Sequence, residues 1–314
     1  MSAVRRFGVM VLCVALCSVV WAGNVQVTVK EGGAAVSGAD VKIDPDGVTG
    51  TTNAAGKWNA TGVTAGAARV MAWTEAGGTL RGAIGEVTVP ARGNVSVDLN
   101  LVPAIWFHQY WPLAVGNTWQ YEYRHSGDDG TWRKIWHETV DRSVMMGGDP
   151  AVVIRGEWDG GPVEWEETRA CNSQGFTMYD QQHGSDTISF DPPIHIGDLM
   201  PVGYEWNASA TAHHSDGSPD SALTFSAKLV RFQTLRVPAA TFRDAPLLQV
   251  EMTLGPETNH LAVWFAKNVG IIREIEKNDV RTNEKLLQDY TVRGLPALRP
   301  IRPIGPLTPR LPKP

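Results

Sequence analysis

One group of candidate catalytic residues is an acidic run, Glu164-Trp165-Glu166-Glu167. Paired carboxyl groups of this kind serve glycoside hydrolysis. In an extended strand Glu164 and Glu166 share one face and Glu167 points away, so an exposed acidic face explains the run equally well. The sequence contains no nucleophile elbow, phosphate-binding loop, dinucleotide-binding loop or His-Glu-x-x-His motif. We therefore expect no catalytic residues and a protein that is not an enzyme.

The second group is a histidine pair followed closely by an acid, His213-His214-Ser215-Asp216. Imidazole and carboxylate groups are common metal ligands, and this is the only tight cluster of them in the chain. Adjacent strand residues point to opposite faces, so His213 and His214 cannot easily share one ion. The following residues, 215–220, favour a loop, and a surface turn is the simpler interpretation. We expect no metal site and no cofactor.

The tryptophans are a better guide to function, because the chain has 12 of them. Four are predicted as binding residues: Trp132, Trp136, Trp158 and Trp165. The first two share a predicted strand face with Lys134 and Glu138, a mixed face that we expect to be more exposed than a core. The other two flank a hairpin loop at residues 159–162. Aromatic rings beside acids and amides suit sugars, whereas the alternative is that they fill the concave side of a large sheet.

Residues 1–22 have the features of a secretory signal peptide. Arg5 and Arg6 form a basic segment, residues 9–20 an apolar core, and Ala22 ends a small-residue cleavage site. The apolar run is shorter than the roughly 20 residues that a membrane span requires. We expect export to the periplasm, the cell surface or the medium, with no transmembrane anchor after cleavage.

Cleavage at this position would leave Cys171 as the one cysteine, so the mature chain could form no internal disulfide. No histidine or aspartate motif accompanies Cys171, and we expect a bystander thiol. Loss of Arg5 and Arg6 would change the formal charge from −5 to −5 − 2 = −7. An acidic chain argues against nucleic acid as a partner.

Two β domains are expected to carry these residues. Residues 23–102 are rich in Val, Thr, Ala and Gly, and short alternating runs separated by Gly-rich turns predict a small β-sandwich. In residues 103–293 alternating runs again follow one another, without a convincing amphipathic helix. They predict a larger, mostly antiparallel curved sheet or open half-barrel.

A family resemblance lies in the first domain. The segments Ala35–Ile43, Gly50–Trp58 and Gly62–Gly66 resemble the carboxypeptidase regulatory-like (transthyretin-like, Cna-B-like) domain. Asn53 stands where that family usually has aspartate, and both residues can hydrogen-bond their own backbone in a tight turn. The resemblance implies an Ig-like sandwich that serves as a non-catalytic spacer or adhesion module.

The threshold of the second domain is the aromatic stretch 105–123, in which Trp119, Tyr121 and Tyr123 alternate on one strand face. We expect an aromatic plug, a turn at residues 116–117, and then a first strand that Trp119 anchors in the core.

A second resemblance covers some 165 residues of this domain. The segments Tyr110–Tyr121, Val237–Phe242 and Trp264–Ile272 are similar to the "YFPLxxGNxWxY", "VPAGTF" and "WYAxxVGLV" motifs of exported bacterial domains of unknown function. That family implies no catalytic residues. Ala240 replaces the usual glycine, so the turn there cannot rely on a positive φ.

Residues 294–314 form a Pro-rich basic tail with proline at every third position from Pro300 to Pro312, the period of a polyproline II helix. We expect it to be extended and unpacked.

The sequence as a whole predicts an exported, non-enzymatic cell-envelope protein that acts by binding or as a structural module. Its expected partner is an envelope glycan or protein. Two alternatives stay open: a carbohydrate-binding or carbohydrate-active protein that uses exposed tryptophans, and a periplasmic carrier of apolar ligands.

Overall fold

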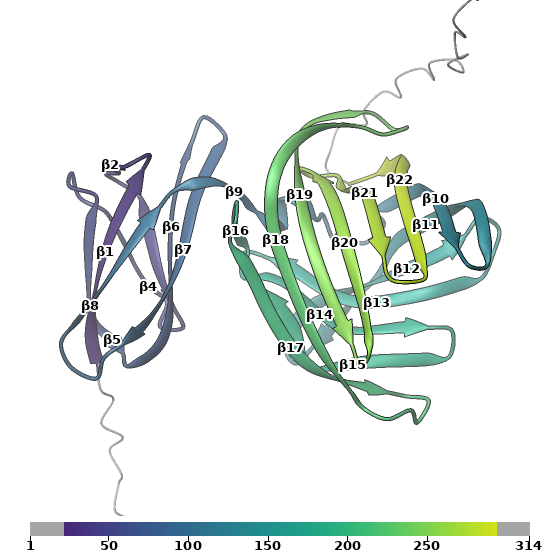
Figure 1. Ribbon diagram of the computed structural model, residues 1–314, viewed down its shortest axis with the longest axis horizontal. Helices are drawn as coiled ribbons and strands as arrows, with labels where there is room; N and C mark the ends of the chain where they lie inside the picture. Colours follow the sequence, from purple (N-terminus) through teal and green to yellow (C-terminus); the bar gives the residue numbers. More distant parts are fainter. Residues whose placement is uncertain (1–21, 294–314) are drawn as a thin grey trace, which may run out of the picture.

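The computed structural model describes residues 22–293. The predicted signal peptide, apart from Ala22, and the predicted tail at 294–314 lie outside these residues. The described chain is built of β-strands and one short 3-10 helix, η1 (Phe107–Tyr110). None of its helices is long and apolar enough to cross a membrane. Figure 1 shows a smaller β unit beside a larger one, so the all-β expectation is confirmed.

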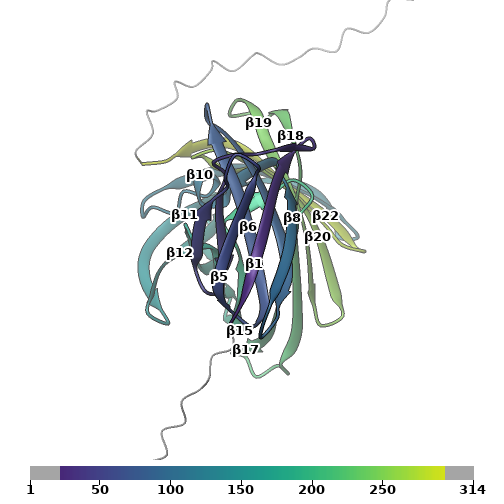
Figure 2. The same cartoon turned by 90° about the vertical axis from the view of Figure 1, so that its left-hand side faces the viewer.

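The smaller unit is a sandwich of two sheets, and Figure 2 looks onto it with the larger unit behind. The first sheet has the order β2-β1-β5, with β8 pairing in parallel with β1. Its strands are β1 (Ala22–Glu31), β2 (Ala34–Ala35), β5 (Lys57–Thr64) and β8 (Asn94–Asn100). The second sheet contains β3 (Asp40–Asp44), β4 (Val48–Thr51), β6 (Gly66–Ala76) and β7 (Thr79–Val89).

The core of the sandwich lies between these sheets and consists of small aliphatic side chains, among them Val25, Val27, Val41, Ile43 and Val70. Strand alternation places such residues inward at every second position. In the turn before β5, the Asn53 side-chain oxygen accepts hydrogen bonds from the backbone N–H of Ala55 (2.9 Å) and Lys57 (3.1 Å), as expected for that position.

Strand β9 (Val102–Trp106) joins the two units, and the predicted boundary at 102/103 falls inside it. One edge of β9 pairs with β7, and the other pairs with β16 (Leu199–Pro201) from the larger unit. The second sheet of the sandwich therefore continues as β16-β9-β7-β6-β3-β4. Side chains from both units pack at this junction, where Trp73 and Trp106 meet edge to face at 5.4 Å.

The larger unit is a closed antiparallel barrel of twelve strands within the described residues. Its strands are β10 (Thr118–Gly127), β11 (Gly130–Met146), β12 (Asp149–Trp158), β13 (Val163–Asn172), β14 (Gly175–His183), β15 (Asp186–Ile196), β17 (Glu205–His214), β18 (Ser221–Arg236), β19 (Thr241–Leu254), β20 (Glu257–Ala266), β21 (Gly270–Lys277) and β22 (Arg281–Thr291). The expectation of an open half-barrel is wrong, because β10 pairs with β22 along its length, from Thr118↔Thr291 to Gly127↔Arg281. This pairing removes the free edges that an open sheet would expose.

The two ends of the barrel differ. We call distal the end formed by the hairpins between β10 and β11, β12 and β13, β14 and β15, β17 and β18, β19 and β20, and β21 and β22. The opposite, proximal end is filled by aromatic rings that follow β9. Phe107, in η1, is 1% exposed and packs edge to face against Phe176 and Phe265, and Trp111 stacks on Phe176 at 5.1 Å. The predicted aromatic plug is confirmed.

Trp119 and Tyr121 lie in the main barrel core, as the alternation of residues 118–123 predicts, and are 3% and 1% exposed. Trp119 Nε1 donates a hydrogen bond to the Val269 carbonyl at 2.5 Å, and the Tyr121 hydroxyl donates to the Ile271 carbonyl at 3.2 Å. In both bonds the two residues are 150 positions apart in the sequence. The inward face of β10, the first barrel strand, is thus bonded to residues near the start of β21.

Residues 23–102 expressed alone are expected to fold, because the sandwich core is built entirely within them. The measurement is a thermal melt with circular dichroism, and we expect a cooperative transition from a β-type spectrum. A longer fragment, residues 23–106, adds β9 and serves as the control for the exposed β7 edge. A random-coil spectrum for both fragments would contradict the prediction.

Candidate ligand site in the barrel

An aromatic cluster lines the distal half of the barrel where β10, β11 and β12 lie side by side. Tyr123, His125, Trp132 and Trp158 form it, and cross-strand pairing of His125 with Trp132 directs both rings to the same face. Trp132 stacks on His125 at 4.8 Å and on Tyr123 at 5.7 Å, with the ring planes within 15° of parallel. Trp158 meets Trp132 edge to face at 5.6 Å and 82°. Trp132 and Trp158 are half-buried, and Lys134 Nζ lies 5.2 Å and 5.4 Å from their ring centres.

Trp136 lies deeper than its sequence context predicts. It is 8% exposed and belongs to the barrel core, so the expectation of an exposed mixed face is wrong for this residue. Its ring covers Gly156 on β12, where a Cβ atom would lie 2.0 Å from the Trp136 ring. The absence of a side chain at Gly156 makes room for the indole, and Trp136 Nε1 donates to Glu138 Oε1 at 3.0 Å. Trp136 also contacts Trp158 at 4.7 Å and so supports the aromatic cluster from below.

A charged triad lies beside these rings. Lys285 on β22 places Nζ 3.2 Å from Glu138 Oε1 on β11 and 3.2 Å from Glu274 Oε1 on β21. The three side chains are 12–20% exposed. Burial alone would lower the pKa of Lys285, but Glu274 and Glu138 raise it above its ordinary value, so the lysine is charged. Burial also raises the pKa of the neighbouring Tyr123 hydroxyl to about 12.

Glu167 is a third interior carboxyl group, and its neighbour Glu166 points the other way. Glu166 lies on the outer face with Arg155 (2.8 Å) and Arg142 (3.1 Å), whereas Glu167 is 3% exposed and paired with the buried Arg169. Burial raises the pKa of Glu167 although Arg169 opposes the change. The Arg169 guanidinium lies over Trp111 at 4.5 Å and Trp165 at 5.7 Å. Trp165 pairs with Gly156 across β12 and β13 and is half-buried against Arg169 and the barrel core, on the same face as Trp136 and Trp158.

A polar chain connects the aromatic cluster to the distal rim. His125 Nδ1 lies 2.8 Å from Asn283 Oδ1, Asn283 Nδ2 donates to Glu276 at 2.8 Å, and His125 Nε2 lies 2.6 Å from Asp129. Hydrogen bonds to the Asp129 and Asn283 oxygens raise the pKa of His125. Local sequence patterns do not indicate Lys285, Glu274, His125 and Asn283, because β10 and β11 are far in the chain from β21 and β22. The one feature these four residues share in the sequence is that each is a polar residue at a strand position whose side chain is expected to point inward.

Cys171 is half-buried, and burial raises its thiol pKa to about 12. A thiol with so high a pKa is protonated at neutral pH, which matches the expected bystander role. Cys171 borders a pocket of about 610 Å³ near the proximal end, between β11, β12 and β13. The side chains of Leu113, Met145 and Val152 make its wall largely apolar.

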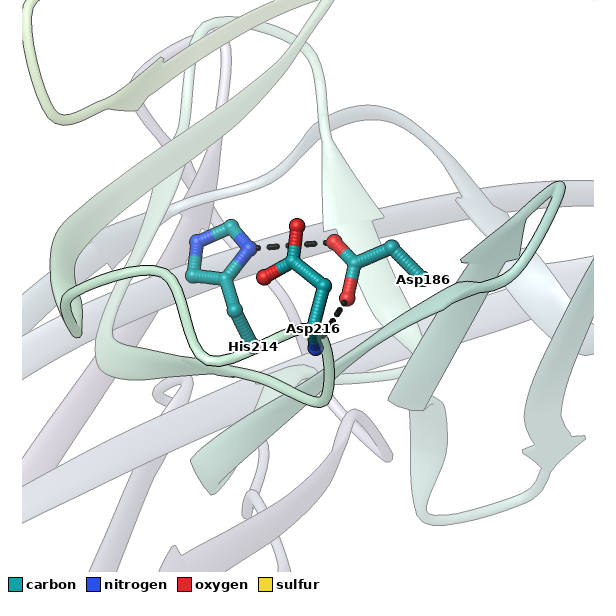
Figure 3. Close-up of side chains that lie close together, drawn as sticks. All are labelled: Asp186, His214 and Asp216. Carbon is teal, nitrogen blue, oxygen red and sulfur yellow. Dashed lines mark hydrogen bonds and ion pairs between the residues drawn. The ribbon is translucent and has the colours of Figure 1, made fainter.

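The histidine pair divides as strand geometry predicts. His213 lies 3.0 Å from Asp220, and His214 lies 3.1 Å from Asp186. Asp186, which the sequence analysis did not consider, brings His214 and Asp216 into a compact group at the distal rim (Figure 3).

No family model and no curated relative matches the chain. One similar solved structure is that of a "putative exported protein with YmcC-like fold" from Bacteroides fragilis. It is 15% identical, covers 58% of this chain and 98% of its own, and gives a TM-score of 0.42. Another is a "putative lipoprotein" from Parabacteroides distasonis, 11% identical, covering 60% of this chain and 99% of its own, with a TM-score of 0.36. Both similarities are too distant to assign a family.

Proposed function

We propose that the chain is exported and acts outside the cytoplasm as a non-catalytic binding protein, with a carbohydrate held at the distal end of its barrel. The observation that carries this proposal is the aromatic cluster of Tyr123, His125, Trp132 and Trp158 beside the charged triad. Aromatic faces pack against the C–H groups of a sugar ring, while carboxylates and amides exchange hydrogen bonds with its hydroxyl groups. The features of residues 1–22 support export.

The arrangement of the rings bears on the kind of carbohydrate. A long glycan would be served by a coplanar row of exposed rings, but Trp132 and Trp158 are 82° apart. Perpendicular rings make a corner, and a corner suits one or two sugar units at the end of a chain. The ligand of this site is therefore a short glycan or a glycan terminus.

A binding role fits the electrostatics of the site better than glycoside hydrolysis. The two carboxylates of the charged triad, Glu138 and Glu274, are both paired with the same Lys285 ammonium group. Hydrolysis requires one carboxyl group that gives up a proton and another that acts separately. Glu167, whose pKa is raised, is buried against Arg169.

One observation favours the alternative, a carrier of apolar molecules. The pocket of about 610 Å³ near the proximal end is large enough for a small ligand, and its wall is largely apolar. The charged triad and the polar chain make the interior of the distal half unsuitable for such a ligand, so the two functions would use opposite ends of the barrel.

A glycan array and a lipid-binding screen on the full chain test the proposal. Trp132→Ala and Trp158→Ala are each expected to weaken glycan affinity about tenfold, which corresponds to about 1.4 kcal/mol of lost stacking energy. Trp58→Ala, which removes a half-buried tryptophan from the sandwich, is the matched control and should leave affinity unchanged. Thermal melts verify that the variants fold.

Glycan affinity that survives both barrel substitutions would overturn the proposal. Lipid binding that is lost in Met145→Asp, at the rim of the proximal pocket, would support the carrier instead.

A further inference from the structure

Asp186, His214 and Asp216 come together at the distal rim from two neighbouring connections. Asp186 is the first residue of β15, directly after the hairpin from β14, and His214 is the last residue of β17. Pairing of β15 with β17 sets Ile188 opposite His214, so Asp186 lies two residues nearer the rim, beside the loop that contains Asp216. Figure 3 shows the three side chains directed toward one another. One potential ligand atom from each lies within 4.8 Å of the others.

The Asp186 carboxylate is held in place by its surroundings. Its Oδ1 accepts hydrogen bonds from the Ser215 backbone N–H and hydroxyl, both at 3.1 Å, and from the Asp216 backbone N–H at 3.3 Å. Its Oδ2 lies 3.1 Å from His214 Nδ1. Bonds of this kind orient a ligating carboxylate and reduce the rearrangement that metal binding would require. The Oδ2 atom therefore faces the imidazole.

We propose that Asp186, His214 and Asp216 bind a divalent transition-metal ion of the Zn²⁺ type at the distal rim. Imidazole nitrogen with two carboxylate oxygens is a donor set that Zn²⁺ accepts, whereas Ca²⁺ and Mg²⁺ take oxygen ligands almost exclusively. The ion takes the space between His214 Nδ1 and Asp186 Oδ2, and the imidazole proton moves to Nε2. A tetrahedral ion held by three side chains keeps a fourth position for water or a further ligand.

The metal site also adds a link between two hairpins that the β15–β17 pairing and the hydrogen bonds of Asp186 already join. Asp186 belongs to one connection and Asp216 to the next, so a shared ion ties the rim together. If the ion binds the folded state and not the unfolded state, the melting temperature rises with the logarithm of the ion concentration. This inference is independent of the carbohydrate proposal, because none of the three ligands belongs to the aromatic cluster.

The chain supplies its own matched control. His213 lies next to His214 on the opposite strand face and pairs with Asp220 at 3.0 Å. This pair supplies two potential ligands, one imidazole and one carboxylate, whereas the proposed site supplies three. Replacement of His213 or His214 by glutamine removes one surface imidazole in each case. The two variants thus separate this site from general affinity of histidines for zinc.

Calorimetric titration of the untagged full chain with ZnCl₂ is the primary test, with CaCl₂ as the comparison ion. We expect one zinc ion per chain and no binding of calcium. His214→Gln and Asp216→Asn should each weaken zinc binding tenfold or more, while His213→Gln leaves it unchanged. Asp186→Asn is a poorer choice because Asp186 also holds the Ser215 turn. Equal loss in the two histidine variants, or zinc affinity unchanged in His214→Gln, would overturn the site.

A second readout protects the test against misfolded variants. Co²⁺ in a tetrahedral site with one nitrogen and two oxygen ligands gives strong visible absorption, which we expect for the unaltered chain and for His213→Gln but not for His214→Gln. Thermal melts without metal should be the same for all three proteins. Weak octahedral absorption in the unaltered chain would contradict the proposed ligand set.

Discussion

Trp119→Ala is expected to destabilise the barrel by about 3–5 kcal/mol, which is the usual cost of truncating a buried aromatic side chain. The indole is 3% exposed, and its loss also leaves the Val269 carbonyl without the hydrogen bond that Nε1 donates. Because domains have only about 5–15 kcal/mol of stability, most of the variant should be unfolded or insoluble. The measurement is urea denaturation of the soluble fraction.

Trp119→Phe provides the control for this substitution. It keeps most of the buried volume but loses the hydrogen bond, and we expect a smaller loss of stability than for alanine. If Trp119→Ala were as stable as the unaltered chain and had only lost ligand binding, Trp119 would be a ligand platform rather than a core anchor.

Lys285→Met is the second substitution with a large expected effect. It leaves Glu138 and Glu274 facing each other in a mostly buried setting without their shared counter-charge. Removal of one partner from a buried ion pair costs about 3–5 kcal/mol. We expect a comparable loss in the free energy of unfolding, measured by urea denaturation at neutral pH.

The matched rescue for Lys285→Met is the triple variant that adds Glu138→Gln and Glu274→Gln. With all three charges removed no buried carboxylate is left unpaired, so most of the lost stability should return. A triple variant no more stable than Lys285→Met alone would show that the cost comes from packing of the lysine stem and not from its charge.

Local sequence patterns predict those strands in which apolar and polar residues alternate clearly. Residues 118–123 have large aromatics at every second position, and the structure buries Trp119 and Tyr121 as predicted. Strands β14 and β15 were not predicted. Their segment carries Gly184 in its turn and the Pro192-Pro193 pair, and both weaken a strand pattern.

The faces of mixed strands could not be assigned from the sequence. Lys134 and Glu138 beside Trp132 and Trp136 indicate an exposed face, yet that face points into the barrel. Glu138 is tolerated there because Lys285, 147 residues later, neutralises it. Partners at such separations are set by strand pairing, and nothing near Glu138 in the chain indicates them.

Closure of the barrel and the grouping of residues at its rim also depend on strand pairing between distant parts of the chain. The pairing of β10 with β22 brings the first and last strands of the domain together, and no local signal distinguishes it from an open edge. Asp186 likewise joins His214 through pairing of β15 with β17. His214 and Asp216 are therefore visible as a cluster in the sequence, whereas the residue that connects them is not.

The position of β9 has a mechanical consequence. Its backbone is hydrogen-bonded to β7 on one edge and to β16 on the other. Two side-chain contacts also join the units: the Tyr204 hydroxyl donates a hydrogen bond to Glu86, and the Arg69 guanidinium lies over the Trp206 ring. A pull on one unit is therefore transmitted to the other through a continuous sheet rather than a slack tether. The sandwich and the barrel should tumble in solution as one rigid body, with a single rotational correlation time, and the distal end of the barrel should stay at a fixed distance from the sandwich.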